Sequence, residues 1–254
     1  MNQDLQQHIV KAARKVAEFG FVASYDGNIS LRSSDGIYIT ATRTLKAETT
    51  IDDVCLIDLN GKFLAGKRTS STEADMHLFI YRERLDVNGI VHTHPPCATA
   101  FAAARQALDA AVFPEVILDI GAVPLAPYAT PSTTEVAESL RPFISWANAI
   151  LLANHGVVVL GSDVFEALHR TEKLEHAAKT LIAARSLGGA VALTRKEVDY
   201  LYETHQDVER RGDLADSGKM NGKVSAEKLV CHSCDEKTDQ DRRKEIVRKI
   251  LAKL

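Results

Sequence analysis

Three histidines of this sequence have the spacing expected of ligands to a single metal ion. His92 and His94 stand two residues apart in a predicted strand, so both imidazoles project from the same face. Pro95 ends that strand and places both rings near a sheet end, where ligand pockets tend to lie. His155 ends another apolar strand, directly before Gly156. Three imidazoles from two strand ends predict an open tetrahedral zinc site with room for water or substrate.

The histidine pair also has a structural interpretation. His92 and His94 would then be ordinary strand residues whose ring nitrogens are satisfied by hydrogen bonds, and for the pair alone the two interpretations are evenly balanced. The heptad-spaced histidines 169 and 176 are predicted to face solvent or to pack, not to bind metal. The remaining histidines stand in or near predicted helices or in the C-terminal region: His8, His77, His205 and His232.

A second group of residues is small and carries amide or hydroxyl groups. Asn28 and Thr42 lie beside predicted strands, and Ser71 and Thr72 open a predicted helix. Such positions let backbone N–H groups and hydroxyls hold a phosphate. Glu73 falls in the first turn of the same helix, where a capping role would also explain it. For this Ser-Ser-Thr-Glu segment, the sequence alone favours a capping box over an anion site.

Hydrophobic periodicity predicts the elements that must position these residues. Helices are expected over 4–19, with Asp4 as its N-cap and Gly20 as its end, over about 73–85, over 97–106, and from Asp163 towards Gly188. Strands are expected over 27–31, 36–40, 53–59, 88–93, 149–153 and 157–160. The chain therefore has a mixed α/β pattern.

Composition limits the class of protein. The 254 residues are 45% hydrophobic and 26% charged, which suits one large domain with a full core and excludes bulk disorder. The net charge of −3 predicts no strong attraction to nucleic acid or anionic membranes. The N-terminus lacks an apolar signal region and the apolar runs are too short to cross a bilayer. We therefore expect a soluble, unexported, cytoplasmic protein without nucleic-acid or membrane partners.

The cysteines and the C-terminal region add little chemistry. Four cysteines are too sparse for a disulfide scaffold and fit a reducing compartment. Cys231 and Cys234 form a lone C-x-x-C without the second pair that structural zinc would need, so they are expected to be incidental. We expect a domain over 1–203 and a charged extension over 204–254. Its terminal amphipathic helix is expected to pack on this protein or a neighbouring subunit, not on a membrane or a calmodulin-like partner.

Four ordered segments resemble the class II aldolase/adducin family. They are Gly27-Asn28-Ile29-Ser30, Ser71-Thr72-Glu73, His92-Thr93-His94-Pro95 and Asn154-His155-Gly156. Residues 124–130 also look like the loop that precedes a helix in this family, so the resemblance spans roughly residues 5–200. It implies an α/β three-layer sandwich, with a central, mainly antiparallel sheet flanked by helices. It also implies a homotetramer with active sites between subunits.

The resemblance further implies a zinc-dependent aldolase. One Zn²⁺ per subunit would be held by His92, His94 and His155, with Glu73 completing the shell until substrate displaces it. Zinc would stabilise the enediolate left when a phosphorylated ketose, such as L-fuculose 1-phosphate, is cleaved to dihydroxyacetone phosphate and an aldehyde. The displaced Glu73 would then be the acid/base. The substrate phosphate would be held by Asn28, Thr42, Ser71 and Thr72.

Arg43 is the first departure from the family pattern. It follows Thr42, where the family commonly has glycine, and an arginine neither permits the same close backbone approach nor tolerates positive φ as glycine does. Arg43 is expected to grip a phosphate or a carboxylate directly, which would suit a phosphorylated sugar acid.

The other departures concern tyrosines. In an ungapped alignment, Phe113 falls where members that cleave fuculose phosphate have a proton-donating tyrosine from the next subunit. Tyr128 or water would replace that donor, or the aldehyde differs. A further family tyrosine near the C-terminus has only Tyr200 and Tyr202 as candidates.

Several activities remain open at this level. A sugar-phosphate 4-epimerase, a dehydratase and a phospho-oxo-acid decarboxylase would all keep the zinc and phosphate sites. Glutamate at position 73, where the related epimerase has aspartate, favours the aldolase. A non-catalytic, adducin-like interaction module would be expected to lose the metal ligands, and all three histidines are present.

Overall fold

The computed structural model describes residues 1–212 and 214, and a single mixed sheet forms their centre. Its eight strands run in the order β4-β3-β2-β1-β5-β8-β7-β6. Neighbouring strands are antiparallel except β6 and β7, which are parallel. The strands are β1 (Asn28–Ser33), β2 (Gly36–Thr40), β3 (Val54–Ile57), β4 (Phe63–Ala65), β5 (Gly89–Thr93), β6 (Leu125–Ala126), β7 (Ala149–Leu152) and β8 (Gly156–Gly161).

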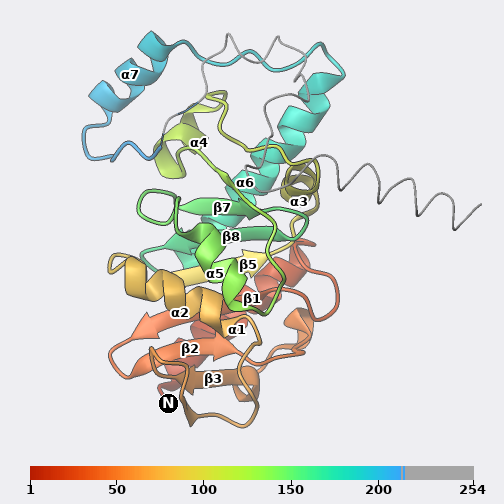
Figure 1. Ribbon diagram of the computed structural model, residues 1–254, viewed down its shortest axis with the longest axis vertical. Coiled ribbons are helices and arrows are strands. Elements are labelled where there is room, and N and C mark those ends of the chain that lie inside the picture. The colour runs from red at the N-terminus through yellow and green to blue at the C-terminus, as the bar shows by residue number, and fades with distance from the viewer. Residues whose placement is uncertain (213, 215–254) are drawn as a thin grey trace, which may run out of the picture. The chain divides into compact units, whose positions relative to one another are not determined.

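Helices cover both faces of this sheet (Figure 1). One face packs against α1 (Gln3–Glu18), α3 (Pro96–Ala103) and α6 (Val164–Arg185), and the other against α2 (Ala74–Glu83) and α5 (Thr134–Leu140). Strand alternation separates the two layers, because Ile90 of β5 packs in the core beneath α2 while the adjacent Val91 packs beneath α1 and α6. This arrangement confirms the predicted three-layer sandwich with a mainly antiparallel sheet.

Most predicted elements lie within a few residues of the observed ones, but the cap of α1 was wrong. Asn2, not Asp4, is the N-cap, and its side chain accepts a hydrogen bond from the backbone N–H of Asp4. Gly20 ends the helix as predicted, with φ of 71°. Several short elements were not predicted from the sequence. Among them are β6, α5, α4 (Pro114–Asp119) and α7 (Arg195–Thr204).

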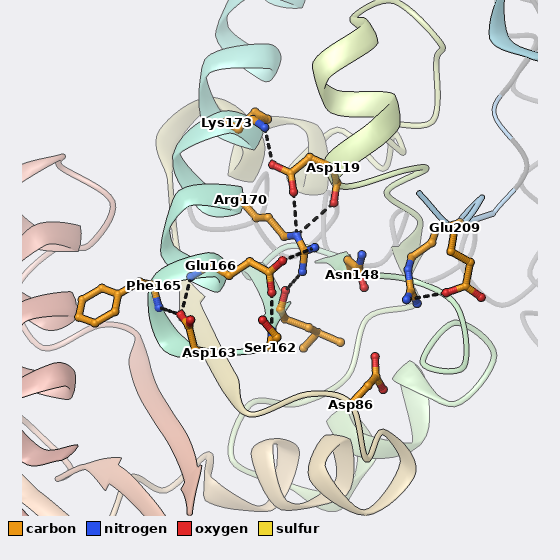
Figure 2. Close-up of polar contacts among 12 residues, drawn as sticks. Asp86, Asp119, Asn148, Ser162, Asp163, Phe165, Glu166, Arg170, Lys173 and Glu209 are labelled. Carbon is orange, nitrogen blue, oxygen red and sulfur yellow. Dashed lines mark hydrogen bonds and ion pairs between the residues drawn. The ribbon is translucent and has the colours of Figure 1, made fainter. Parts of the chain in front are cut away.

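The long helix α6 begins where its sequence predicted. The Asp163 carboxylate caps it by accepting hydrogen bonds from the backbone N–H groups of residues 165 and 166. About two turns later, Arg170 lies 3.2 Å from Asp119 and 2.8 Å from Glu166, and its guanidinium donates to the Leu160 carbonyl (Figure 2). These contacts fix α6 against the end of β8 and against α4.

The C-terminal part of the described chain returns to the sandwich. After α7, the Arg211 carbonyl accepts a hydrogen bond of 3.1 Å from the backbone N–H of Ala122. The predicted terminal helix and the Cys231/Cys234 pair lie outside the described residues, and the proposed boundary at residue 203 stays a prediction. Within residues 1–212 and 214, no helix is both long enough and apolar enough to cross a membrane.

Candidate active site

Strand pairing brings the first site residues together. Asn28 of β1 is the cross-strand partner of His92 of β5, so both side chains project towards the α2 layer. Gly27, just before β1, has φ of 74°, and a Cβ there would lie 2.7 Å from the His92 carbonyl oxygen. Only glycine suits this backbone conformation and this approach of the two strands.

A tight connection between β7 and β8 brings in the third histidine. Asn154 has φ of 57°, a left-handed conformation that asparagine tolerates better than most residues, and it turns the chain at His155. At Gly156, a Cβ would lie 2.4 Å from the His94 ring and 2.6 Å from the Thr93 carbonyl oxygen. The glycine therefore allows the end of β5 to approach the start of β8, which places His94 beside His155.

Glu73 reaches the same point from the opposite layer. It occupies the N-cap position of α2, but its side chain makes no capping hydrogen bond. Instead its carboxylate accepts a hydrogen bond of 2.8 Å from Asn28 Nδ2 and lies near two of the histidines. The capping-box interpretation of this segment is therefore wrong. Ser71 supplies the local contact, because its hydroxyl accepts a hydrogen bond from the Glu73 backbone N–H.

The four side chains form a compact donor set. Candidate ligand atoms of His92, His94 and His155 all lie within 4.8 Å of one another. Glu73 Oε2 is 3.4 Å from His92 Nε2, and Glu73 Oε1 is 3.5 Å from His155 Nε2. Two ligands of one tetrahedral metal ion, each about 2.1 Å from it, are separated by about 3.4 Å. The carboxylate and these two imidazoles are thus spaced as ligands of a single ion.

The outer ring nitrogens are held in the way that metal-binding histidines usually are. His92 Nδ1 lies 2.9 Å from the Val157 carbonyl oxygen, to which it donates, so Nε2 is left with its lone pair directed to the site. His94 Nδ1 lies 3.5 Å from Asp26 Oδ2. Sequence reasoning missed Asp26, which precedes the Gly27 turn and has no motif of its own.

The inner atoms lack partners of their own. Within the described part of the chain, Glu73 Oε1, His92 Nε2 and His94 Nε2 are buried without a hydrogen-bond partner. Buried polar atoms normally have a hydrogen-bond partner. Three such atoms without one, all directed at the same point, are what a bound cation would coordinate. The residues therefore fit a divalent metal ion that prefers nitrogen and carboxylate ligands.

Burial keeps these histidines ready to act as ligands. It lowers the pKa of His94 and of His155 to about 4, and charge on neighbouring His92 acts in the same direction. Burial by itself would raise the pKa of the Glu73 carboxyl, but His92, His155 and the Asn28 hydrogen bond together hold that pKa well below its usual range. At neutral pH the site thus presents neutral His94 and His155 rings and an ionised Glu73 carboxylate.

These pKa shifts predict how stability depends on pH in the metal-free protein. The folded pKa values of His94 and His155 lie below the unfolded value of 6.5, so unfolding takes up protons between about pH 4 and 6.5. Their contribution is complete above pH 6.5 and is lost as the pH falls towards 4. Each histidine can contribute up to about 1.4 kcal/mol per pH unit to the free energy of unfolding.

Urea unfolding of the metal-free protein at pH 7.0, 6.0 and 5.0 would measure this slope. His94→Gln should flatten it. His169→Gln, which changes an exposed histidine on α6, should leave it as it is. Equal slopes for the parent and the His94 variant would contradict the prediction.

The candidate phosphate residues lie on two adjoining segments beside Glu73. Residues 40–42 run beside 69–71, with hydrogen bonds from Ser71 N to the Thr40 carbonyl and from Thr42 N to the Thr69 carbonyl. Arg68 also donates to the Thr42 carbonyl, at 2.9 Å. Thr72 lies at the start of α2, where its hydroxyl accepts from Ser132. Thr42, Ser71 and Thr72 are therefore close in the fold despite their separation in sequence.

Arg43 keeps the backbone conformation for which glycine was expected. Its φ is 52°, so this arginine adopts the left-handed conformation that glycine tolerates more readily. Arg68 donates to the Arg43 carbonyl at 3.3 Å, which helps to hold the turn despite the strain of a left-handed non-glycine residue. The side chain of Arg43 is exposed and free to meet a ligand.

The tyrosine candidates lie in different environments. Tyr128 is 54% exposed and Tyr200 is 65% exposed, whereas Tyr202 donates a hydrogen bond to the Ile117 carbonyl. Phe113 is half-buried at the N-cap position of α4. Within one chain, Tyr202 is thus committed to packing, and the two exposed phenols remain available.

Two further residues near the site carried no sequence signal. His77 on α2 is fully buried, and its Nε2 lies 2.5 Å from Asn28 Oδ1. Lys46 is also buried, and it donates to the carbonyls of Tyr25 and Thr44, which ties the loop before β1 to the turn containing Arg43. Burial lowers the pKa of Lys46 to about 8. Neither residue could be predicted from the sequence, because His77 stands in the apolar pattern of a helix and Lys46 in a segment that resembles a surface loop.

A carboxylate and three imidazoles that could hold a metal ion, set in an α/β sandwich, are typical of a metal-assisted enzyme site. Comparison with known proteins gives the family. Residues 7–182 match the family model for the class II aldolase and adducin N-terminal domain. The chain belongs to this family, and it is an enzyme of the aldolase lyase type.

Similar proteins carry more than one activity. An L-fuculose phosphate aldolase from Methanococcus maripaludis is 37% identical over 170 residues, 67% of this chain and 92% of the relative. A 5-deoxy-D-ribulose 1-phosphate aldolase from Bacillus thuringiensis is 32% identical, over 78% and 94%. A 3-oxo-tetronate 4-phosphate decarboxylase from Haemophilus influenzae is 30% identical, over 80% and 95%. A solved L-fuculose 1-phosphate aldolase superposes with a TM-score of 0.75 at 29% identity, over 81% and 98%.

Proposed function

We propose that this enzyme is a zinc-dependent aldolase that cleaves a phosphorylated ketose of the L-fuculose 1-phosphate type to dihydroxyacetone phosphate and an aldehyde. The observation that carries the proposal is the Glu73 carboxylate beside three histidines whose candidate ligand atoms converge. The relatives that cleave ketose 1-phosphates support the same reaction type. We assign the zinc ligands as His92, His94 and His155, with Glu73 as the fourth in the absence of substrate.

The residues then divide the work of carbon–carbon cleavage. A zinc ion in this site supplies Lewis-acid stabilisation of the negative charge that cleavage leaves on the dihydroxyacetone phosphate half. Glu73 acts as the acid/base: in cleavage its protonated carboxyl gives a proton to the nascent carbanion, and in the reverse condensation its carboxylate removes that proton. Because the pKa of Glu73 is held low before substrate binds, its displacement from the histidines is what makes it a useful base.

We assign the substrate phosphate to the two segments beside the N-terminus of α2. Thr42, Ser71 and Thr72 supply hydroxyl and backbone groups, and the positive end of the ten-residue helix favours an anion. Arg43 adds a mobile guanidinium at the rim, and Asn28 lies between this region and Glu73. This placement would leave the bond to be broken near the histidines.

In cleavage the hydroxyl on the carbon that becomes the aldehyde must give up its proton, and in the reverse condensation the aldehyde oxygen must receive one. A proton-transfer group is therefore needed on the side from which the aldehyde leaves. We assign this role to a residue from a neighbouring subunit, with Tyr128 as the candidate phenol because it is exposed in the single chain. This assignment requires a homotetramer with sites at subunit interfaces. Sedimentation velocity of the purified protein tests it, and a monomer that retains full activity would contradict it.

A second candidate is the decarboxylation of a phosphorylated 3-oxo acid, favoured by the exposed guanidinium of Arg43 and by the Haemophilus influenzae relative. Loss of carbon dioxide from 3-oxo-tetronate 4-phosphate leaves the same enediolate, and protonation of that enediolate gives dihydroxyacetone phosphate. The two reactions therefore need the same metal and proton shuttle, and they differ in the group that leaves.

A substrate panel separates the two candidates. L-Fuculose 1-phosphate, L-rhamnulose 1-phosphate, ribulose 1-phosphate, 5-deoxyribulose 1-phosphate and 3-oxo-tetronate 4-phosphate would be assayed for dihydroxyacetone phosphate by coupled NADH oxidation, with and without a chelator. We expect chelator-sensitive release from a ketose phosphate. Release from the oxo acid alone, with carbon dioxide and with a KM that rises in Arg43→Gly, would instead establish the decarboxylase. If zinc-loaded protein released no dihydroxyacetone phosphate from any of these substrates, both assignments would be overturned.

A further inference from the structure

A continuous row of buried polar groups runs from Glu73 into the layer between α2 and the sheet. Asn28 Nδ2 lies 2.8 Å from Glu73 Oε2, and Asn28 Oδ1 lies 2.5 Å from His77 Nε2. On the other side of the imidazole, His77 Nδ1 lies 2.6 Å from Ser30 Oγ, which in turn is 2.8 Å from the Tyr81 hydroxyl. Asn28, Ser30 and His77 are buried, and His77 and Ser30 are 0% exposed.

The direction of every hydrogen bond in this row follows from its first member. Asn28 donates from Nδ2 to Glu73 Oε2, which turns the other end of its amide, Oδ1, towards His77 Nε2. The reversed amide would place two acceptor oxygens 2.8 Å apart. The Asn28 carbonyl oxygen therefore faces His77 and can only accept, which requires a proton on His77 Nε2.

The remaining contacts agree with this direction. A neutral imidazole protonated at Nε2 carries a lone pair at Nδ1, which accepts from the Ser30 hydroxyl. The Ser30 oxygen then accepts from Tyr81, whose phenol keeps its proton because burial raises its pKa. Burial also lowers the pKa of His77 to about 3, so the ring is neutral at physiological pH. Each group in the row thus has a hydrogen-bond partner, and only one assignment of donors and acceptors achieves this.

We propose that His77 is a positioning residue: as the neutral Nε2–H tautomer it fixes the Asn28 amide, which in turn holds the Glu73 carboxylate towards His92 and His155. The inference rests on the proposed role of Glu73 and extends it. His77 touches no reacting atom, so it acts only through Asn28.

The same geometry excludes His77 as a proton source for Glu73. A proton could pass along the row only if the Asn28 carboxamide accepted one at oxygen and released one from nitrogen, which an ordinary amide does not do at neutral pH. Glu73 must therefore exchange its proton on the side that faces substrate. The row therefore sets the orientation of the Glu73 carboxylate and provides no path for a proton between Glu73 and the protein interior.

The ring tautomer is a direct test that needs neither metal nor substrate. Two-bond ¹H–¹⁵N correlation spectra of the metal-free protein distinguish an Nε2–H ring from an Nδ1–H ring, and comparison with His77→Gln assigns the signals. We expect His77 as the neutral Nε2–H form at pH 7. A neutral Nδ1–H ring would overturn the proposal, because Asn28 would then have to turn its oxygen towards Glu73. A charged ring would also overturn it, because Nδ1 could then no longer accept from the Ser30 hydroxyl.

Variants test the functional consequence. His77→Leu removes the N–H donor, and we expect kcat to fall by about 10- to 100-fold, with the KM and the zinc content close to those of the parent. His77→Gln can place an amide N–H near the same point and should recover most of kcat. Tyr38→Phe is the control for the loss of a buried hydroxyl, because Tyr38 lies in β2 on the opposite side of the sheet.

The outcomes separate this proposal from the proposed function. Equal loss of kcat in the leucine and glutamine variants, both folded and zinc-loaded, would overturn the positioning role. A leucine variant as active as the parent would do the same. If the parent enzyme shows no activity on any substrate of the panel, the proposed function fails. The tautomer measurement then still decides whether the Asn28 amide is fixed as described.

Discussion

The variant Glu73→Gln should fold and bind zinc, yet release dihydroxyacetone phosphate about 10²- to 10⁴-fold more slowly than the parent enzyme, which is the range that a positioned acid/base contributes. Glutamine keeps an oxygen near His92 and His155 but cannot take up or give a proton at neutral pH. The loss should therefore appear in kcat. Steady-state kinetics on the ketose phosphate identified by the panel, with metal analysis of the same sample, would measure it.

The matched control for this substitution is Glu172→Gln, which changes an exposed glutamate on α6 without approaching the site. It should keep full activity. If Glu73→Gln retained at least half of the parent kcat, Glu73 could not be the proton shuttle, and water or Tyr128 would become the candidate. A variant that lost its zinc would instead show that Glu73 acts mainly as a ligand.

The variant His94→Ala should lose most of its bound zinc and most of its activity. The Nε2 atom of His94 is buried, makes no hydrogen bond within the described residues and converges with His92 and His155. Removing one of three imidazoles leaves an incomplete site. A metal ion contributes several kcal/mol of charge stabilisation to such reactions, and a loss of about 4 kcal/mol corresponds to about 10³-fold in rate.

Zinc content after dialysis, measured by mass spectrometry, is the primary result for this variant, and kcat/KM is the second. His176→Ala is the control because His176 is an exposed histidine on α6. The control should retain one zinc per chain. Unchanged zinc content in His94→Ala would remove His94 from the ligand set. Zinc well below one per chain in the parent would argue against the whole assignment.

Much of the fold could be predicted because its signals are local. Alternation predicted the strands β1, β2 and β3, while hydrophobic periodicity and Asp163 predicted α6. The histidine set was predictable for the same reason. His92 and His94 share a strand face, and His155 stands beside a glycine at the end of another strand.

Other features depended on contacts between distant segments. The sequence around Glu73 favoured a capping box. In the fold its carboxylate instead contacts Asn28 and two histidines, and the Ser71 hydroxyl accepts the hydrogen bond from the backbone N–H at the start of the helix. His77 resembled an ordinary residue of an apolar helix face. Its role depends on Asn28 and Ser30, which lie more than 40 residues earlier in the chain.

By itself, the sequence predicted the mixed strands and helices and a shared site for the three histidines, because strand alternation, turns and spacing act over a few residues. Its resemblance to the family implied the three-layer sandwich and the aldolase chemistry. Only the tertiary structure decided where the Glu73 carboxylate points, that Arg43 keeps a left-handed turn and that His77 fixes the Asn28 amide. The physical reason is that a polar side chain has several local partners of similar energy. The hydrogen-bond partner it finally takes depends on which buried polar groups of other segments the packed sheet and helix place beside it.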